Sequence, residues 1–121
     1  MTTIAGQLAY HSGLAAEKQI AQDYERRGFP VACERWRGSG GEIDLIARDG
    51  DGLVFVEVKR SRSFARAVEQ LSQRQIERIC ASASEYLALE PRGQLTDVRF
   101  DLALVDGQGQ VRIIENAFGH G

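Results

Sequence analysis

Apolar residues recur along this chain with two different periods, and these periods predict both helices and strands. Over residues 4–27 they fall three and four positions apart and form one stripe, which predicts an opening helix. Gly28 and Pro30 then end that helix. A second helical pattern covers residues 63–90 and stops before Pro91. The expected buried stripes are Ala9, Gly13, Ala16, Ile20 and Tyr24 in the first helix and Ile76, Ile79, Cys80, Ala83 and Leu87 in the second.

Short apolar runs between turn-forming residues predict strands at residues 30–36, 43–48, 53–59, 98–105 and 111–115. Glycine-rich turns separate neighbouring strands, at residues 38–41, 49–52 and 106–109. The element order is helix, three strands, helix, two strands, which predicts an α/β fold with a mixed sheet flanked by helices. No repeat or linker interrupts this order, so we expect one domain over residues 1–121, with a mobile tail in the last few residues.

Composition narrows the class of protein. The chain has 121 residues, 43% of them apolar, which suffices for one globular domain without staples. No apolar run approaches the ~20 residues of a membrane helix, and we expect neither a signal peptide nor a membrane partner. Cys33 and Cys80 lie far apart in the sequence without a histidine cluster, so neither a zinc site nor a disulfide framework is expected. This cysteine usage fits a cytoplasmic protein.

Charge is distributed unevenly, although the whole chain carries a net charge of only −2. Residues 59–78 contain six basic and two acidic residues, a local net charge of +4, and both flanking parts are acidic. A local basic patch is enough to bind a polyanion, so nucleic acid is a candidate partner. The alternative is an ordinary solvated helix face. The six basic residues are Lys59, Arg60, Arg62, Arg66, Arg74 and Arg78.

The central predicted hairpin carries the candidate chemistry. If residues 49–52 form its loop, Arg48 pairs with Leu53 and the register of the two strands is set. Because side chains alternate along a strand, the polar positions near the open end share one face, and opposed Cβ atoms lie about 5 Å apart. The register places Asp44 opposite Glu57 and Glu42 opposite Lys59. Ile46 and Phe55 are expected on that same face, and Ile43, Leu45, Val54, Val56 and Val58 on the other.

Two opposed carboxylates in an apolar hairpin need an offsetting charge. Like charges about 4 Å apart repel by about 1 kcal/mol in water and by about 4 kcal/mol at an effective dielectric constant near 20. A hard cation such as Mg²⁺ or Mn²⁺ takes oxygen ligands and commonly uses one or two carboxylates. We therefore expect a divalent-cation site at Asp44 and Glu57. The alternative is a solvated hairpin with a Glu42–Lys59 ion pair.

The two strands also resemble a known family. The segments Gly-Glu-Ile-Asp-Leu-Ile (residues 41–46) and Val-Phe-Val-Glu-Val-Lys (residues 54–59) are similar to the small bacterial YraN-type proteins. Through them the chain resembles PD-(D/E)xK nucleases, the restriction-endonuclease-like superfamily that includes archaeal Holliday-junction resolvases. The resemblance implies a restriction-endonuclease-like fold, with Asp44 and Glu57 as metal ligands and Lys59 at the attacking water or the phosphate. It also implies that Glu17 on the first helix assists the metal. Glu42, on the same predicted hairpin face as Asp44 and Glu57, is expected to support the site.

This chain departs from the family pattern in three places. Ile43 replaces the proline before the aspartate, the segment Arg60-Ser61-Arg62 replaces the Thr-Arg that usually follows the lysine, and Gln73-Arg74 stands where relatives often have a lysine. The changes leave the carboxylates and the lysine in place. They affect residues that would contact a nucleic-acid backbone.

Our functional expectation is a metal-dependent nuclease acting on structured or branched DNA, which is favoured over RNA. Arg60, Arg62, Arg66, Arg74 and Arg78 would hold backbone phosphates. Arg35 and Arg37 are expected to contact nucleic acid as well, and Trp36 between them either stacks on an unpaired base or packs against the core. Cutting a junction would require two active sites and hence a symmetric homodimer. The alternatives are a non-catalytic nucleic-acid-binding protein of the same fold and an interaction protein with acidic ends.

Overall fold

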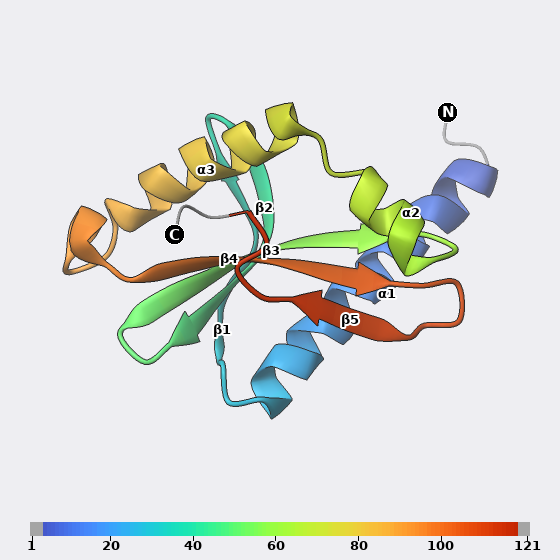
Figure 1. Cartoon of the computed structure of the whole chain (residues 1–121), viewed down its shortest axis with the longest axis horizontal. Helices are drawn as coiled ribbons and strands as arrows, with labels where there is room; N and C mark the ends of the chain where they lie inside the picture. Colours follow the sequence, from blue (N-terminus) through green and yellow to red (C-terminus); the bar gives the residue numbers. More distant parts are fainter. Residues whose placement is uncertain (1–3, 119–121) are drawn as a thin grey trace.

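Five strands form a single open sheet, and helices cover both of its faces (Figure 1). The computed structural model describes residues 4–118, with side chains from residue 13 onward. Its elements are α1 (Ile4–Arg26), β1 (Val31–Gly38), β2 (Gly41–Asp49), β3 (Gly52–Arg60), α2 (Phe64–Glu69), α3 (Gln73–Leu87), the 3-10 helix η1 (Gly93–Leu95), β4 (Val98–Val105) and β5 (Val111–Ile114). The predicted α/β fold and its element order are confirmed. Within residues 4–118, no helix is long and apolar enough to cross a membrane.

The strands lie in sequence order, β1-β2-β3-β4-β5, and the pairing is antiparallel except between β3 and β4. Parallel neighbours need a long crossover connection, and α2 with α3 supplies it here. Because β3 and β4 run in the same direction, their carboxyl ends meet at one edge of the sheet, where Arg60 pairs with Val105. The chain leaves β3 at this edge and enters α2 four residues later, at Phe64.

Each face of the sheet buries a separate apolar cluster. On one face, Ile20 and Tyr24 of α1 pack against a group that includes Leu45 and Val56. On the other face, Ile79 of α3 packs in a group with Phe55 and other strand residues. The predicted stripe of α1 is confirmed at Ala16, Ile20 and Tyr24, which are buried. The side chain of Ala9, also predicted for that stripe, and the predicted tail at residues 119–121 lie outside the described part of the chain.

The predicted second helix, residues 63–90, is two helices, so its expected continuity is wrong. Ser63 caps α2 by accepting a hydrogen bond from Arg66 N at 3.3 Å. Ser72 caps α3 by accepting one from Gln75 N at 3.1 Å. Between the caps, Leu71 packs beside the buried residues under α2. A serine that satisfies a free amide at a helix start favours a new helix over continuation of the old one.

Candidate metal centre

The register of the central hairpin is confirmed, but the two strands separate at its open end. Arg48 pairs with Leu53, and the ladder runs from Asp49↔Gly52 to Leu45↔Val56. Beyond the Leu45↔Val56 pair, the amide of Val58 donates its hydrogen bond to a side chain instead of a backbone carbonyl of β2. The acceptor is Asp44 Oδ2, at 2.8 Å. The Asp44 carboxylate therefore lies where β2 leaves β3.

Side-chain alternation along β2 breaks at the same place. Ile43 packs in the cluster on the α3 face, whereas Leu45 packs in the cluster on the α1 face. Residues two apart in a regular strand share a face, so the strand turns over once between them. The expectation that Ile43 shares a face with Leu45 is wrong, and so is the expectation that Glu42 lies opposite Lys59. On β1, Arg35 has a positive φ of 54° beside this irregularity.

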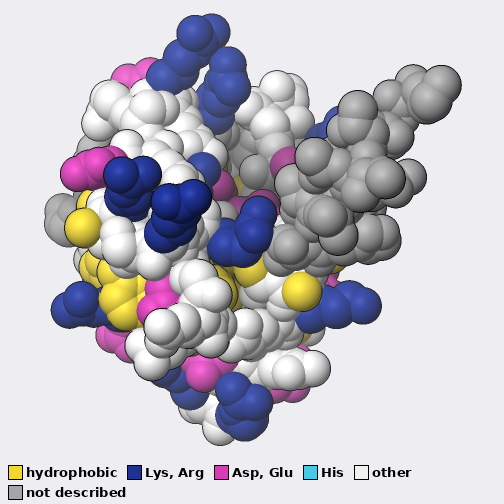
Figure 2. All heavy atoms as spheres, turned by 90° about the vertical axis from the view of Figure 1, so that its right-hand side faces the viewer, with side chains coloured by type: hydrophobic (Ala, Val, Ile, Leu, Met, Phe, Trp, Pro, Cys, Tyr) yellow, Lys and Arg dark blue, Asp and Glu magenta, His cyan; other side chains and the backbone are white. Residues whose placement is uncertain are grey.

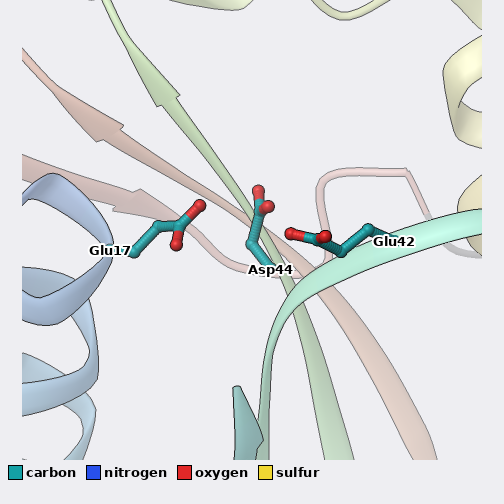
Figure 3. A group of neighbouring side chains, drawn as sticks. All are labelled: Glu17, Glu42 and Asp44. Atoms are coloured by element: carbon teal, nitrogen blue, oxygen red, sulfur yellow. The ribbon is translucent and has the colours of Figure 1, made fainter. Parts of the chain in front are cut away.

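Three carboxylates converge at this point, with Asp44 between the other two (Figure 3). Glu17 extends from α1, whereas Glu42 and Asp44 come from β2 (Figure 3). One oxygen of each carboxylate lies within 4.8 Å of an oxygen of the other two. The helix and the strand thus bring Glu17 and Asp44 together, as the resemblance implied, and Glu42 joins them.

Glu57 of β3 contacts Asp44 but is not one of the three converging carboxylates. The two carboxyl groups are in hydrogen-bonding contact, and Glu57 is buried, with 5% of its surface exposed. Gln75 Nε2 donates a hydrogen bond to Glu57 Oε1 at 2.9 Å, and Lys59 Nζ lies 3.4 Å from the same oxygen. We call Glu17, Glu42, Asp44 and Glu57 the carboxylate group. Among the described residues, Glu17, Glu42 and Asp44 have carboxylate oxygens close enough to one another to share an ion, and Glu57 contacts this set through Asp44.

The cations beside the carboxylate group differ from those expected. Arg35, predicted to contact nucleic acid, has Nε 3.2 Å from Glu42 and 3.5 Å from Glu17. Arg37 Nη2 lies 3.4 Å from the other Glu42 oxygen. Lys59 pairs with Glu57 and not with Glu42, because β2 has already left β3 where the predicted pair would stand. Glu42 is therefore paired across the β1–β2 hairpin.

The acids titrate abnormally because they are crowded and desolvated. Burial, with the nearby charge of Asp44, raises the pKa of Glu17 to about 7. Burial and the Asp44 charge likewise raise the pKa of Glu57 to about 8, against the opposing effect of Lys59. Burial also raises the pKa of Asp44. Burial is the main cause of each rise, and the charge of Asp44 adds to it for Glu17 and Glu57. Carboxylate oxygens are the type of donor that Mg²⁺ and Mn²⁺ prefer.

Gln75 is a site residue that the sequence analysis missed. It is the residue three after the helix-capping Ser72, a Ser-x-x-Gln spacing that marks a helix start. Recognising that spacing would have moved the start of α3 to residue 73. Its side chain, however, reaches across to Glu57, which only the packing of α3 on the sheet decides.

The residues predicted to contact nucleic acid lie in different parts of the structure. Trp36 is half-buried and packs edge-to-face on Tyr86, with ring centroids 5.4 Å apart, which corresponds to the packing alternative. Arg74 and Arg78 are exposed on α3. Arg60, Arg62 and Arg66 line one pocket of about 710 Å³. Figure 2 shows Lys and Arg side chains spread over this end of the molecule, with acidic side chains visible among them.

The mixed sheet flanked by helices defines an α/β protein in which the carboxylates of Glu17, Glu42 and Asp44 converge. Residues 16–105 match the uncharacterised protein family UPF0102, and the chain belongs to this family. It is 63% identical over 110 residues to a UPF0102 protein of Ruegeria pomeroyi, covering 91% of this chain and 89% of that one. It is 58% identical over 115 residues to one of Cereibacter sphaeroides, covering 95% and 98%. A relative from Roseobacter denitrificans is 51% identical over 117 residues, covering 97% and 91%.

Proposed function

We propose that this protein is a metal-dependent nuclease that hydrolyses phosphodiester bonds, with structured or branched DNA as its substrate. The observation that carries the proposal is the position of Asp44, whose carboxylate contacts Glu57 and lies within 4.8 Å of Glu17. Lys59 stands beside them. The resemblance of the two strands to PD-(D/E)xK nucleases supports the same activity.

Asp44, Glu57 and Glu17 would hold Mg²⁺ or Mn²⁺, with Glu42 in support. The chemistry that such a cation supplies is the activation of water and the stabilisation of charge on phosphate oxygens. Gln75 fixes the orientation of Glu57 through its 2.9 Å hydrogen bond. Arg35 holds Glu17 and Glu42 in place through its paired contacts.

Lys59 is the group that would meet the reacting atoms. Its ammonium has three donors, and its side chain is 16% exposed, so it is partly desolvated but accessible. One donor is directed to Glu57, which leaves others for an attacking water or a phosphate oxygen. A positive group fixed in this way stabilises the charge that develops on the phosphate. Arg60, Arg62, Arg66, Arg74 and Arg78 would hold neighbouring phosphates without reading sequence.

The test is a cleavage assay with branched, nicked, duplex and single-stranded DNA and with RNA, each with Mg²⁺, Mn²⁺ or EDTA. We expect Mn²⁺-dependent cleavage of branched DNA that is lost in Asp44→Asn and strongly reduced in Lys59→Met. Asn can still accept the Val58 amide hydrogen, so this variant isolates the lost charge. Cleavage that survives in Asp44→Asn would overturn the proposal, because it would come from a contaminating enzyme.

A non-catalytic nucleic-acid-binding protein is the second candidate function, and the basic residues fit it equally well. Calorimetry with Mn²⁺ separates the two. Mn²⁺ binding that is lost in Glu57→Gln favours the nuclease, whereas wild-type protein that binds DNA but no cation favours the binding protein.

Junction cleavage would also need a symmetric dimer, which analytical ultracentrifugation measures. We also propose a cytoplasmic location, which the sparse cysteine content of the sequence favours.

A further inference from the structure

A pocket opens at the edge of the sheet where the parallel strands β3 and β4 end. Its floor includes Val105, the last residue of β4, and one wall is α1 at Ala15, Ala16 and Gln19. Three arginines from the end of β3 to α2 also line it: Arg60, Arg62 and Arg66. The turn after β4, at residues 106–109, closes the remaining side, and Gln19 Nε2 ties α1 to it by donating to Gly109 O at 2.6 Å.

The arginines of this pocket are available to a ligand. Among the described residues, no carboxylate lies within 4.0 Å of the guanidinium of Arg60, Arg62 or Arg66. Asp106 lines the same pocket, but its Oδ1 accepts the amide hydrogens of Gln108 and Gln110 within its own turn. Forked guanidinium donors without protein partners suit phosphate oxygens.

The rest of the lining suits a flat, neutral group. Ala15, Gly107 and Gly109 present small surfaces that let a planar ring approach closely. Guanidinium planes themselves stack on nucleic-acid bases. The volume of about 710 Å³ lies within the range for one small ligand. It exceeds what a phosphate alone fills.

The pocket and the carboxylate group are neighbours. Glu17 lies between Ala16 and Gln19 on α1, and Lys59 directly precedes Arg60 on β3. From Glu57 to Arg60 the strand advances about 10 Å at ~3.3 Å per residue. A nucleic-acid strand positioned at the carboxylate group therefore has to span only about 10 Å to reach the pocket.

We propose that this arginine pocket binds one unpaired nucleotide of the substrate strand, beside the phosphodiester bond positioned at the carboxylate group. The inference rests on the proposed function and adds the substrate class, which is nucleic acid with an unpaired nucleotide next to the bond. Arg62 and Arg66 hold its phosphate, and the base lies against the alanine and glycine surfaces. Fully paired duplex lacks such a nucleotide and binds outside the pocket.

The test measures binding and not cleavage, so it does not depend on nuclease activity. A short labelled single-stranded oligonucleotide and a blunt duplex of the same sequence are titrated into the full-length Asp44→Asn protein in EDTA. Arg62→Gln removes a phosphate contact. Gly107→Leu fills the pocket without changing charge, and a Cβ there meets nothing nearer than Arg62 Cα at 3.8 Å. Arg92→Gln, at an exposed position outside the pocket, is the matched charge control.

We expect both pocket variants to weaken single-strand binding about tenfold and duplex binding much less, with Arg92→Gln close to the parent. Arg62→Gln also lowers the salt dependence of single-strand binding by about 0.7 in slope. Equal loss for single strand and duplex, with no effect of Gly107→Leu, would overturn the inference. So would a mononucleotide that competes as tightly as the oligonucleotide, because the ligand would then be a free nucleotide. If these results hold while no DNA is cleaved, the proposed function fails and the pocket stands.

Discussion

Asp44 Oδ2 accepts the amide hydrogen of Val58 at 2.8 Å, at the point where the β2–β3 ladder has ended. One side chain thus has two tasks. It satisfies a backbone donor that the separating strands leave without a ladder partner, and it presents its charge to Glu17 and Glu57. Separating the two tasks experimentally distinguishes a structural from a functional role for this residue.

The first prediction compares two substitutions at this position. Asp44→Asn keeps an oxygen for the Val58 amide and removes a repelling charge, whereas Asp44→Ala leaves the amide without an acceptor. We expect Asp44→Asn to be more stable than Asp44→Ala by about 1 kcal/mol in the absence of metal, measured by thermal or urea unfolding. Both should lose Mn²⁺ binding. Equal stability of the two variants would show that water replaces the carboxylate at Val58.

The second prediction concerns pH. Folding raises the pKa of Glu17 to about 7 and that of Glu57 to about 8, from an ordinary value of 4.5. Between about pH 4.5 and pH 8 the folded protein therefore holds more protons than the unfolded chain, so the stability of the metal-free protein falls as pH rises. We expect the melting temperature in EDTA to be lower at pH 8 than at pH 5.5.

Metal should reverse this trend, because a cation binds the deprotonated carboxylates. With Mn²⁺ present, the stabilisation should grow from pH 5.5 to pH 8. Glu57→Gln provides the control, since it removes one titrating group and should flatten the pH dependence in EDTA. A melting temperature in EDTA that rises steadily over this range in the wild-type protein would contradict the prediction.

The third prediction tests Gln75 as a positioning residue. Its amide donates to Glu57 Oε1 at 2.9 Å, and residues that orient metal ligands typically contribute 10–100-fold to metal affinity. Gln75→Ala should therefore weaken Mn²⁺ binding at least about tenfold in calorimetry while the fold is retained. Gln73→Ala, at an exposed position on the same helix, is the matched control. An equal effect of both variants would assign the loss to the helix and not to the hydrogen bond.

The fourth prediction concerns stability away from the carboxylate group. The Tyr24 hydroxyl donates to Asp101 Oδ2 at 2.6 Å, and both residues are almost fully buried. Asp101 also accepts hydrogen bonds from the Arg99 side chain and from Asn116 N, which joins α1, β4 and the segment after β5. Hydrogen bonds to charged groups contribute about 1.5–3 kcal/mol.

Tyr24→Phe should accordingly lower the free energy of unfolding by about 2 kcal/mol, measured by urea denaturation. Tyr86→Phe is the control, since the Tyr86 hydroxyl makes no hydrogen bond to any described residue and its ring should keep its packing against Trp36. Comparable losses in the two variants would mean that removing a tyrosine hydroxyl, and not losing the hydrogen bond to Asp101, is responsible.

The sequence by itself determined the strands, their order along the chain and the register of the central hairpin near its turn. These features follow from local physics, because alternation with a period of two and an Asp-Gly turn specify which residues pair. The Arg48↔Leu53 pairing and the proximity of Asp44 to Glu57 came out as predicted. The spacing of Ser72 and Gln75 also indicates a helix start at residue 73, and hence the break between α2 and α3. The sequence analysis did not use this signal because the apolar pattern continues through it.

Only the tertiary structure decided the composition of the carboxylate group and of its partners. Alternation assumes a regular strand, and β2 turns over at Asp44 once it leaves β3, which no local pattern specifies. Glu42 therefore meets Arg35 across the other hairpin and not Lys59. Gln75 reaches Glu57, and three arginines surround one pocket, because helices distant in sequence pack against the sheet edge. Such contacts depend on how whole elements dock, and docking is set by the sum of many small packing energies.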